Sequence, residues 1–257
     1  YADVVVGAYN YSNGQNNEGQ SYLYLGSATG LATTSAWTRE VNQATGYFGY
    51  SVSNAGDING DGYSDVVVGA YNYSNGQNFE GQSYLYLGSS SGLATTTAWA
   101  VGSSQPTSLF GSAVGTAGDV NGDGYSDVIV GAAYYTNGED TEGKAFLYHG
   151  SSSGLAITTA WTGESNQSFS MYGDTAATAG DVNGDGYSDV AVGNLVVVYD
   201  NGNVTLAGPA VLYLGSSSGL ATTTAWTGQP EQDGSGFGWP LGTAGDVNGD
   251  GYSDLIV

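Results

Sequence analysis

The sequence predicts an all-β fold, a β-propeller made of four-stranded antiparallel blades. A segment rich in Asp and Gly recurs along the chain at a step of about 62 residues, and a tryptophan recurs at the same step. Short apolar runs closed by Gly, Asn, Asp or Ser divide each repeat into four strands. Repeats of this size stack radially as blades, which buries the sheet faces and leaves only short edges. A flat array or a sandwich of the same sheets would leave whole faces in water.

The repeated segment reads GDINGDGYSDVVVGA at residues 56–70 and returns, with small changes, at 118–132, 180–194 and 245–257. A copy without its first half opens the chain as YADVVVGA. The second marker is an Ala-Trp pair, and its tryptophans are Trp37, Trp99, Trp161 and Trp226. Because these tryptophans are large apolar side chains at fixed strand positions, we expect them to pack between blades.

The second repeat illustrates the four strands in order. We expect strands at Tyr50–Ala55, Asp65–Ala70, Gln82–Leu87 and Ala94–Ala100, with a polar loop from Asp57 between the first two. The second strand is apolar at nearly every position, as in a strand covered on both faces, whereas the third alternates like a half-buried strand. The repeat is therefore a four-stranded meander.

The organisation predicted for the whole chain is one propeller region over residues 1–257. We expect a partial blade with strands two to four at 1–38, complete blades at 45–100, 107–162 and 169–227, and a partial blade with strands one and two at 236–257. Closure of these strands into a ring of four blades would leave one strand in excess. The sequence therefore predicts an excerpt of a longer array, or a chain whose ends meet a neighbouring copy.

Composition excludes several classes of protein. The chain has 257 residues, 44 Gly, 21 Tyr and no Cys, which rules out a disulfide scaffold, a thiolate zinc site and a cysteine nucleophile. With 24 Asp and Glu against 2 Lys and Arg, the net charge of −22 makes nucleic acid and anionic membrane surfaces poor partners. Apolar runs are strand-sized, so no membrane insertion is expected. Any export leader is expected to lie outside this sequence.

The loop between the first two strands of each repeat has the pattern D-x-N-x-D-G-x-x-D. Side-chain oxygens at positions 1, 3, 5 and 9 and the main-chain carbonyl of position 7 form a set of hard donors that suits Ca²⁺, and Gly at position 6 permits the sharp turn. Position 12 is Val instead of the bidentate Glu of an EF-hand. The predicted ligands are Asp57, Asn59, Asp61, Tyr63 and Asp65; Asp119, Asn121, Asp123, Tyr125 and Asp127; Asp181, Asn183, Asp185, Tyr187 and Asp189; and Asp246, Asn248, Asp250, Tyr252 and Asp254.

Three carboxylates within nine residues repel one another, and a divalent ion offsets that repulsion. One calcium in each of the four loops would change the net charge from −22 to −14. A single loop of this kind could equally be a solvated turn. Four loops in phase favour metal binding.

The repeats resemble the FG-GAP repeats of integrin α-subunit propellers and their bacterial relatives. The Phe-Gly element precedes the acidic loop at Phe48-Gly49, Phe110-Gly111 and Phe237-Gly238, with Tyr172-Gly173 as a variant. The Gly-Ala element follows it at Gly7-Ala8, Gly69-Ala70 and Gly131-Ala132. The family's following Pro is replaced by Tyr9, Tyr71 and Ala133, and Gly193-Asn194 departs further.

The resemblance implies that the calcium is structural and lies on one face of the propeller. The opposite face, formed by the loops between strands two and three and between strands four and one, would bind a partner. Candidate ligand-binding residues there are Tyr9, Asn10, Tyr11, Tyr71, Asn72 and Tyr73. Aromatic and amide side chains suit sugars or polar peptide, but the same residues also occur in ordinary hairpin tips.

The function expected from these observations is that of an extracellular or cell-surface adhesion or interaction module, with a protein or glycan ligand and no reaction of its own. Three alternatives stay open: a lectin on the same scaffold, a structural segment of a surface filament or giant adhesin that contacts neighbouring copies or the rest of a longer chain, and a non-catalytic part of a polysaccharide-active enzyme. His149, Lys144 and Arg39 show no partner in the sequence, and we expect them at the surface.

Overall fold

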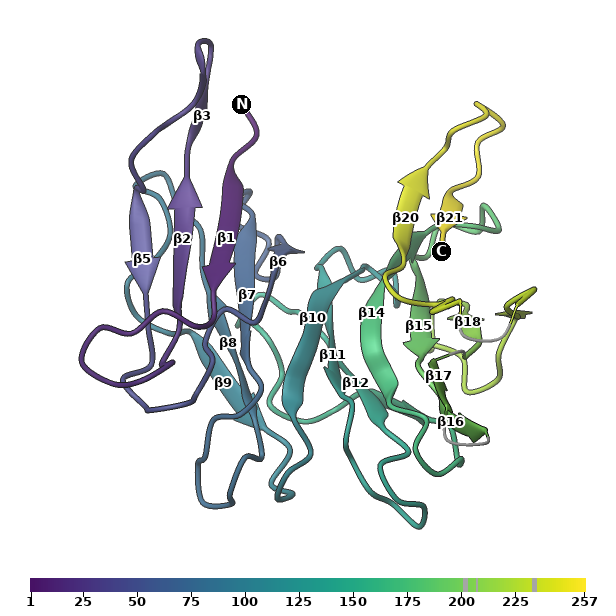
Figure 1. The fold of residues 1–257 in the computed structure, drawn as a ribbon. Helices are drawn as coiled ribbons and strands as arrows, with labels where there is room; N and C mark the ends of the chain where they lie inside the picture. Colours follow the sequence, from purple (N-terminus) through teal and green to yellow (C-terminus); the bar gives the residue numbers. More distant parts are fainter. Residues whose placement is uncertain (201–202, 207, 233–234) are drawn as a thin grey trace.

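The computed structural model of the chain describes residues 1–200, 203–206, 208–232 and 235–257, and every regular element in these residues is a β-strand. Three sheets have four strands each, with consecutive strands antiparallel. Figure 1 shows the sheets following one another in an arc, with the N-terminal and C-terminal sheets at its two ends. This arrangement confirms the all-β propeller fold. In the described part of the chain, no helix has the length and apolarity needed to cross a membrane.

The three complete sheets repeat one plan. The first contains β6 (Ser51–Gly56), β7 (Asp65–Ala70), β8 (Gln82–Tyr86) and β9 (Trp99–Gly102). The second contains β10 (Phe110–Gly118), β11 (Asp127–Ala132), β12 (Lys144–Tyr148) and β13 (Trp161–Glu164). The third contains β14 (Tyr172–Gly180), β15 (Asp189–Asn194), β18 (Ala210–Tyr213) and β19 (Trp226–Gly228).

Smaller sheets flank these three. The N-terminal sheet contains β1 (Val4–Ala8), β2 (Gln20–Tyr24) and β5 (Trp37–Arg39), and the C-terminal sheet contains β20 (Gly242–Gly245) and β21 (Asp254–Ile256). Two short hairpins, β3 (Gly26–Ser27) with β4 (Gly30–Leu31) and β16 (Val197–Asp200) with β17 (Asn203–Leu206), project from loops.

The fourth strand of the first complete sheet differs from the prediction. In the first complete sheet it begins at Trp99 and ends at Gly102, whereas we expected Ala94–Ala100. Residues 94–98 form bends instead, because the Ala94 N–H donates to the Leu87 carbonyl at 2.8 Å and the Ala98 N–H donates to the Leu85 carbonyl at 2.9 Å. The other three strands of this sheet lie within one residue of the expected bounds.

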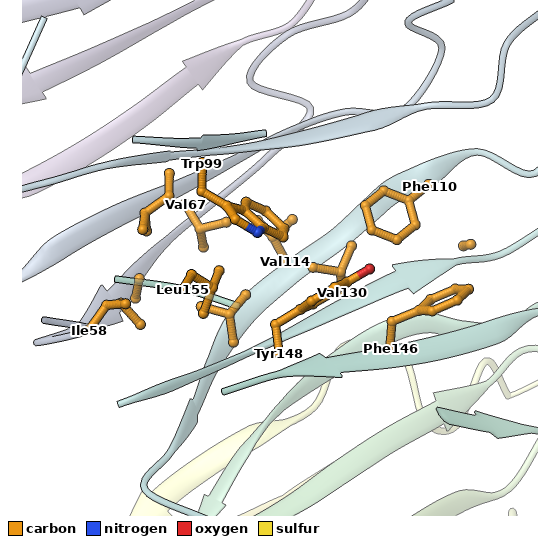
Figure 2. Close-up of a cluster of buried hydrophobic side chains, with 13 residues drawn as sticks. Ile58, Val67, Trp99, Phe110, Val114, Val130, Phe146, Tyr148 and Leu155 are labelled. Carbon is orange, nitrogen blue, oxygen red and sulfur yellow. The ribbon is translucent and has the colours of Figure 1, made fainter. Parts of the chain in front are cut away.

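The hydrophobic core lies between neighbouring sheets. Figure 2 shows Trp99 of β9 and Val67 of β7 facing Phe110 of β10 and Tyr148 of β12. Every residue of β7 is buried, as its apolar run predicts for a strand covered on both faces. The indole Nε1 of Trp99 donates to the Ala156 carbonyl of the next blade at 2.9 Å. Trp37 and Trp161 make the same bond to their next blades.

Glycine is required where neighbouring blades touch through their backbones. A Cβ added to Gly69 of β7 would lie 2.1 Å from the Gly111 carbonyl oxygen, so the glycine of the Gly-Ala element faces the glycine of the next Phe-Gly element. A Cβ at Gly81 would lie 2.1 Å from the Phe110 carbonyl oxygen, and these two residues form a parallel bridge. No side chain fits at these contacts, so the Phe-Gly and Gly-Ala elements set the spacing of the blades.

Candidate metal loops and an opposing tyrosine cluster

Each acidic loop wraps its backbone around the aspartate at position 1. In the loop after β6, the Asp57 carboxylate accepts hydrogen bonds from the N–H groups of Gly60 at 2.8 Å, Asp61 at 3.1 Å and Gly62 at 2.8 Å. Gly60 and Gly62 adopt φ values of 73° and 89°, which residues with a Cβ rarely take. The loop is therefore closed around a carboxylate by its own N–H groups.

Positions 3 and 5 are joined to each other. The Asn59 amide Nδ2 donates to Asp61 Oδ2 at 2.9 Å, and the Asp61 N–H donates to Asn59 Oδ1 at 3.1 Å. The Tyr63 N–H donates to Asp61 Oδ1 at 3.0 Å. The loops after β10 and β14 repeat these contacts at the equivalent residues. The same short sequence therefore gives the same fold in each of these loops.

The aspartate at position 9 is buried in the loops after β6, β10 and β14, where it ties the loop to the sheet. Asp65 is fully buried, and its carboxylate accepts the Ile58 N–H at 2.9 Å and the Gly88 N–H at 2.8 Å. Burial raises the pKa of Asp65, although these two N–H groups favour the charged form. By contrast, N–H groups led by that of Gly251 lower the pKa of the exposed Asp246 carboxyl at position 1. A buried position 9 carboxylate favours a neighbouring cation.

The lysine and arginine side chains do not serve as that cation. Lys144 Nζ lies 3.1 Å from Glu164 Oε2, and Arg39 donates to the carbonyls of Thr95 and Thr38. These two residues are all the Lys and Arg in the chain. Lys144, which we expected at the surface, is only partly exposed, because its side chain is 15% exposed and pairs with Glu164.

His149 is the one basic group at an acidic loop. Its Nδ1 lies 3.1 Å from Asp127 Oδ1, and this contact raises the pKa of the imidazole. His149 is partly exposed, at 28% of its side chain, and has a partner that the sequence did not reveal. The sequence did not reveal the contact because position 9 and the end of the third strand are far apart along the chain.

The donor chemistry of the loops fits a hard divalent cation. All five predicted donors in each loop are oxygens, and two of them are a carboxamide and a main-chain carbonyl. Among the residues that the structure describes, no group of three or more His, Cys, Asp or Glu side chains is spaced to hold a metal. Each predicted set includes three of these side chains, the aspartates at positions 1, 5 and 9, beside an amide and a carbonyl, and the three aspartates are not grouped in this way. The metal therefore stays a prediction that rests on donor type.

Four tyrosines gather at the opposite end of the sheets. The rings of Tyr47 and Tyr71 stack with their centroids 5.3 Å apart and their planes 3° from parallel. Tyr50 packs edge-on against Tyr71 at 4.4 Å and against Tyr9 at 5.3 Å. Tyr9 and Tyr50 are 40% and 45% exposed. Burial raises the pKa of Tyr71 to about 12. We call Tyr9, Tyr47, Tyr50 and Tyr71 the tyrosine cluster.

The structure brings two of the six predicted ligand residues, Tyr9 and Tyr71, into this cluster. Asn10 and Tyr11 are exposed beside it, and the Asn72 amide donates to the Thr45 carbonyl at 2.8 Å. Tyr73 instead packs against the core. Tyr47 and Tyr50, which flank the Phe-Gly element as Tyr-Phe-Gly-Tyr, were not among the predicted ligand residues.

A cavity of about 440 Å³ opens beside the tyrosine cluster. It lies among β6, β10 and β14, and its lining includes Tyr50, Asp174 and Trp239. Burial raises the pKa of Asp174. The cluster and the cavity share Tyr50, so together they form one continuous surface.

A repeated glutamate, which the sequence analysis also missed, organises the loops at this end. Glu18, Glu80 and Glu142 each precede a glycine, and their side chains are almost completely buried. Glu80 Oε1 accepts the Asn75 N–H at 2.7 Å within its own loop, and the Glu80 carbonyl accepts the Phe110 N–H of the next blade at 3.1 Å. The repeated Glu-Gly pair was the available signal.

Backbone strain is concentrated at the same end of the propeller. In the part of the chain that the structure describes, the residues other than glycine with positive φ all lie in the loops between strands two and three or between strands four and one. They are Asn17, Asn42, Thr45, Tyr47, Phe79, Ser104, Thr107, Leu109, Thr141, Asn166, Phe169 and Met171. Such conformations persist only where the surroundings hold them, and they cluster at functional sites.

Comparison with known proteins identifies the repeats. A model described as FG-GAP repeat matches residues 48–86 and 110–148. Integrin alpha-8 of Gallus gallus is 37% identical over 166 residues, which cover 59% of this chain and 15% of that protein. Integrin alpha-7 of Mus musculus is 34% identical over 153 residues (59% and 12%), and integrin alpha-4 of Xenopus laevis is 31% identical over 215 residues (82% and 19%). The chain thus spans less than a fifth of the length of these relatives.

Proposed function

We propose, from the premise that this chain is an FG-GAP repeat β-propeller like that of integrin α subunits, that it serves as an adhesion or interaction module outside the cell or at its surface. In this proposal the acidic loops hold calcium for stability, and the opposite end of the sheets binds a protein ligand. The proposed role includes no chemical reaction.

The observation that carries the proposal is the contrast between the two ends of the sheets. At one end, equivalent loops repeat the same contacts around their own carboxylates. At the other end lie the strained residues, the tyrosine cluster and the cavity beside it. Regular, self-contained loops suit a structural role, whereas exposed aromatic rings on a rigid backbone suit recognition.

Different residues of the chain have different proposed roles at each end. Bound calcium would supply the positive charge that the three carboxylates of a loop lack. The N–H groups of the loop hold the position 1 carboxylate in place, and Asp65 connects the loop to the sheet through Gly88. At the other end, Tyr47 and Tyr71 support each other by stacking, and this leaves Tyr9 and Tyr50 exposed to a ligand.

Chelation tests the calcium part of the proposal. A ligand that binds only the folded state stabilises it by mass action, by about 2.7 kcal/mol at a concentration 100 times its Kd. We expect the melting temperature of the chain to rise with added CaCl₂ and to fall in EDTA. We expect MgCl₂ to raise the melting temperature less than CaCl₂ does. Equal melting curves in EDTA and in millimolar CaCl₂ would contradict the structural role of calcium.

A cell-adhesion assay tests the ligand part. Wells are coated with the parent chain, with Tyr50→Ala, or with the matched control Ile157→Ala. Ile157 is 77% exposed in the loop between β12 and β13, at the end of the sheets away from the tyrosine cluster. We expect Tyr50→Ala to lose most of the adhesion and Ile157→Ala to keep it.

Treatment of the cells identifies the class of ligand. If trypsin treatment of the cells abolishes adhesion and glycosidase treatment does not, the result supports a protein ligand. Adhesion that glycosidases abolish would instead favour the lectin. Equal adhesion by Tyr50→Ala and the parent would show that the tyrosine cluster is not the binding surface.

A further inference from the structure

Neighbouring acidic loops are joined by a hydrogen bond between their backbones. The Ser126 N–H in the second loop donates to the carbonyl of Asp57 in the first loop at 3.0 Å. The same bond joins Ser188 to Asp119 at 2.9 Å and Ser253 to Asp181 at 2.8 Å. In each case position 8 of one loop donates to position 1 of the preceding loop. The four complete loops therefore form a linear series with three links.

The linking group also belongs to the predicted ligand set. Ser126 occupies position 8, so its N–H is part of the peptide group whose carbonyl belongs to Tyr125 at position 7. That carbonyl is a predicted calcium ligand of the second loop, while the N–H of the same peptide group bonds to the first loop. One rigid, planar group therefore connects two loops, because the peptide bond does not rotate freely.

Close packing prevents the two loops from moving independently. A Cβ added to Gly60 of the first loop would lie 2.8 Å from the Tyr125 ring, and a Cβ at Gly56 would lie 2.2 Å from the Ser126 hydroxyl. The rings of Tyr187 and Tyr252 lie equally close to Gly122 and Gly184 of their preceding loops. A shift of the position 7 residue therefore displaces the neighbouring loop.

We propose that these shared peptide groups couple calcium binding in neighbouring loops, so that filling one loop raises the affinity of the next. The inference rests on the calcium-binding role proposed above. A cation at the Tyr125 carbonyl fixes the orientation of the peptide plane and polarises it, and polarisation strengthens the hydrogen bond that the Ser126 N–H donates. The preceding loop is then already ordered, so the loop loses less conformational entropy when it binds its own ion. The position 8 serines are thus positioning residues.

The charge of a filled neighbour acts in the opposite direction, because it reduces the negative potential at the next loop. The loops are exposed at positions 5 and 6, so salt screens this effect. In about 1 M NaCl the Debye length is about 3 Å, and coupling through the peptide group remains. The test is therefore carried out at this salt concentration.

A double-mutant cycle on calcium binding isolates the coupling. Asp61→Asn, Asp123→Asn and Asp185→Asn each remove the position 5 carboxylate from an equivalent loop, and position 5 makes no bond to a neighbouring loop. The overall calcium association constant of the parent, the single variants and the double variants is measured by competition with a chromophoric chelator. The cycle cancels the intrinsic affinities of the individual loops.

Adjacent and separated pairs give different expected results. For Asp61→Asn with Asp123→Asn, the loops share a link, and we expect a coupling factor of about fivefold or more, the lower end of typical couplings between sites. For Asp61→Asn with Asp185→Asn, an intact loop lies between the altered ones, and we expect a factor of about 1. The second pair is the matched control, because it removes the same number of carboxylates and ions.

Each outcome decides one question. A factor of 1 for both pairs, or equal factors for both, would overturn the coupling while leaving calcium binding intact. A parent chain that binds no calcium would overturn the proposed role of the loops themselves. If Asp123→Asn does not fold, as judged by its circular dichroism, Asp250→Asn combined with Asp185→Asn and with Asp61→Asn supplies the same comparison of adjacent and separated loops.

Discussion

The contact between the Gly-Ala and Phe-Gly elements predicts that Gly69→Ala separates two blades. The added methyl carbon would lie 2.1 Å from the Gly111 carbonyl oxygen and 2.3 Å from the Ser51 hydroxyl. Contacts of a Cβ below 3.0 Å are essentially never seen, and the nearest atom here belongs to the backbone of the next blade. The blades must therefore move apart by about 1 Å, since the Gly111 carbonyl oxygen, unlike a side chain, cannot rotate out of the way.

The size of the effect follows from what this movement disturbs. Overpacking a well-filled interior costs about 1–3 kcal/mol, and a rigid backbone neighbour places Gly69→Ala near the upper end. The Ser51 hydroxyl donates to the Gly111 carbonyl at 2.7 Å, and loss of this bond adds about 1 kcal/mol. A total of about 3–4 kcal/mol lowers the melting temperature by about 6–16 °C for a chain of this size.

Tryptophan fluorescence follows the effect directly, because Trp99 lies in the core between these two blades. The matched control is Gly242→Ala, at a glycine with no atom within 4 Å of the added carbon. We expect the control to melt within about 2 °C of the parent, since a surface change of this kind is worth about 0.5 kcal/mol or less. A melting temperature of Gly69→Ala equal to that of the parent, or an equal decrease in the melting temperatures of both variants, would refute the proposed clash between the blades.

Three other predictions concern stability. Ser83→Ala should raise the free energy of unfolding, measured in urea, by about 1 kcal/mol. The Ser83 hydroxyl is buried without a partner among the described residues, and the next repeat has Ala145 at the equivalent position. Trp99→Ala should lower the free energy of unfolding by about 3–5 kcal/mol in the same assay, and Trp226→Ala should lower it much less, because Trp226 is 43% exposed. Equal losses in the two variants would contradict packing of Trp99 between blades. Folding raises the pKa of Tyr71 from about 10 to about 12, so its contribution to stability is present below pH 10 and disappears as the pH rises through 12. Tyr71→Phe should therefore reduce the loss of stability between pH 10 and 12, measured by melting.

The strands were predictable because their signals are local. The predicted strand Asp65–Ala70 has the same first and last residues as β7. An apolar run that follows Asp and ends at turn residues is typical of a buried strand. The fourth strand was placed too early because the run Ala94-Thr-Thr-Thr-Ala98 looks extended in the sequence. In the structure, bonds from Ala94 and Ala98 back to the third strand bend it before Trp99.

The sites were only partly predictable, because their remaining members come from other blades or distant loops. The acidic loop is contiguous and was visible, whereas the Gly88 N–H that holds Asp65 comes from 23 residues away. Tyr47 and Tyr50 join Tyr9 only because one blade packs beside the next. Glu80 was overlooked because an isolated glutamate usually lies at the surface, and only its repeated position before glycine indicates burial.

The two ends of the propeller depend on each other through the spacing of the blades. Tyr9 follows β1 in the N-terminal sheet, whereas Tyr50 and Tyr71 flank β6 and β7 in the next, so their relative positions depend on how far apart these sheets lie. At the opposite end the acidic loops span the boundaries from the first complete sheet onward, through bonds such as that from Ser126 to Asp57, whereas the N-terminal sheet carries no complete acidic loop in this sequence. Any ion that draws neighbouring loops together also fixes the angle between their sheets, because each sheet is a hydrogen-bonded unit. Calcium at one end would therefore hold the walls of the cavity beside the tyrosine cluster, on β6, β10 and β14, in their geometry at the other, and ligand affinity should follow calcium concentration even though no acidic residue of the loops contacts the ligand.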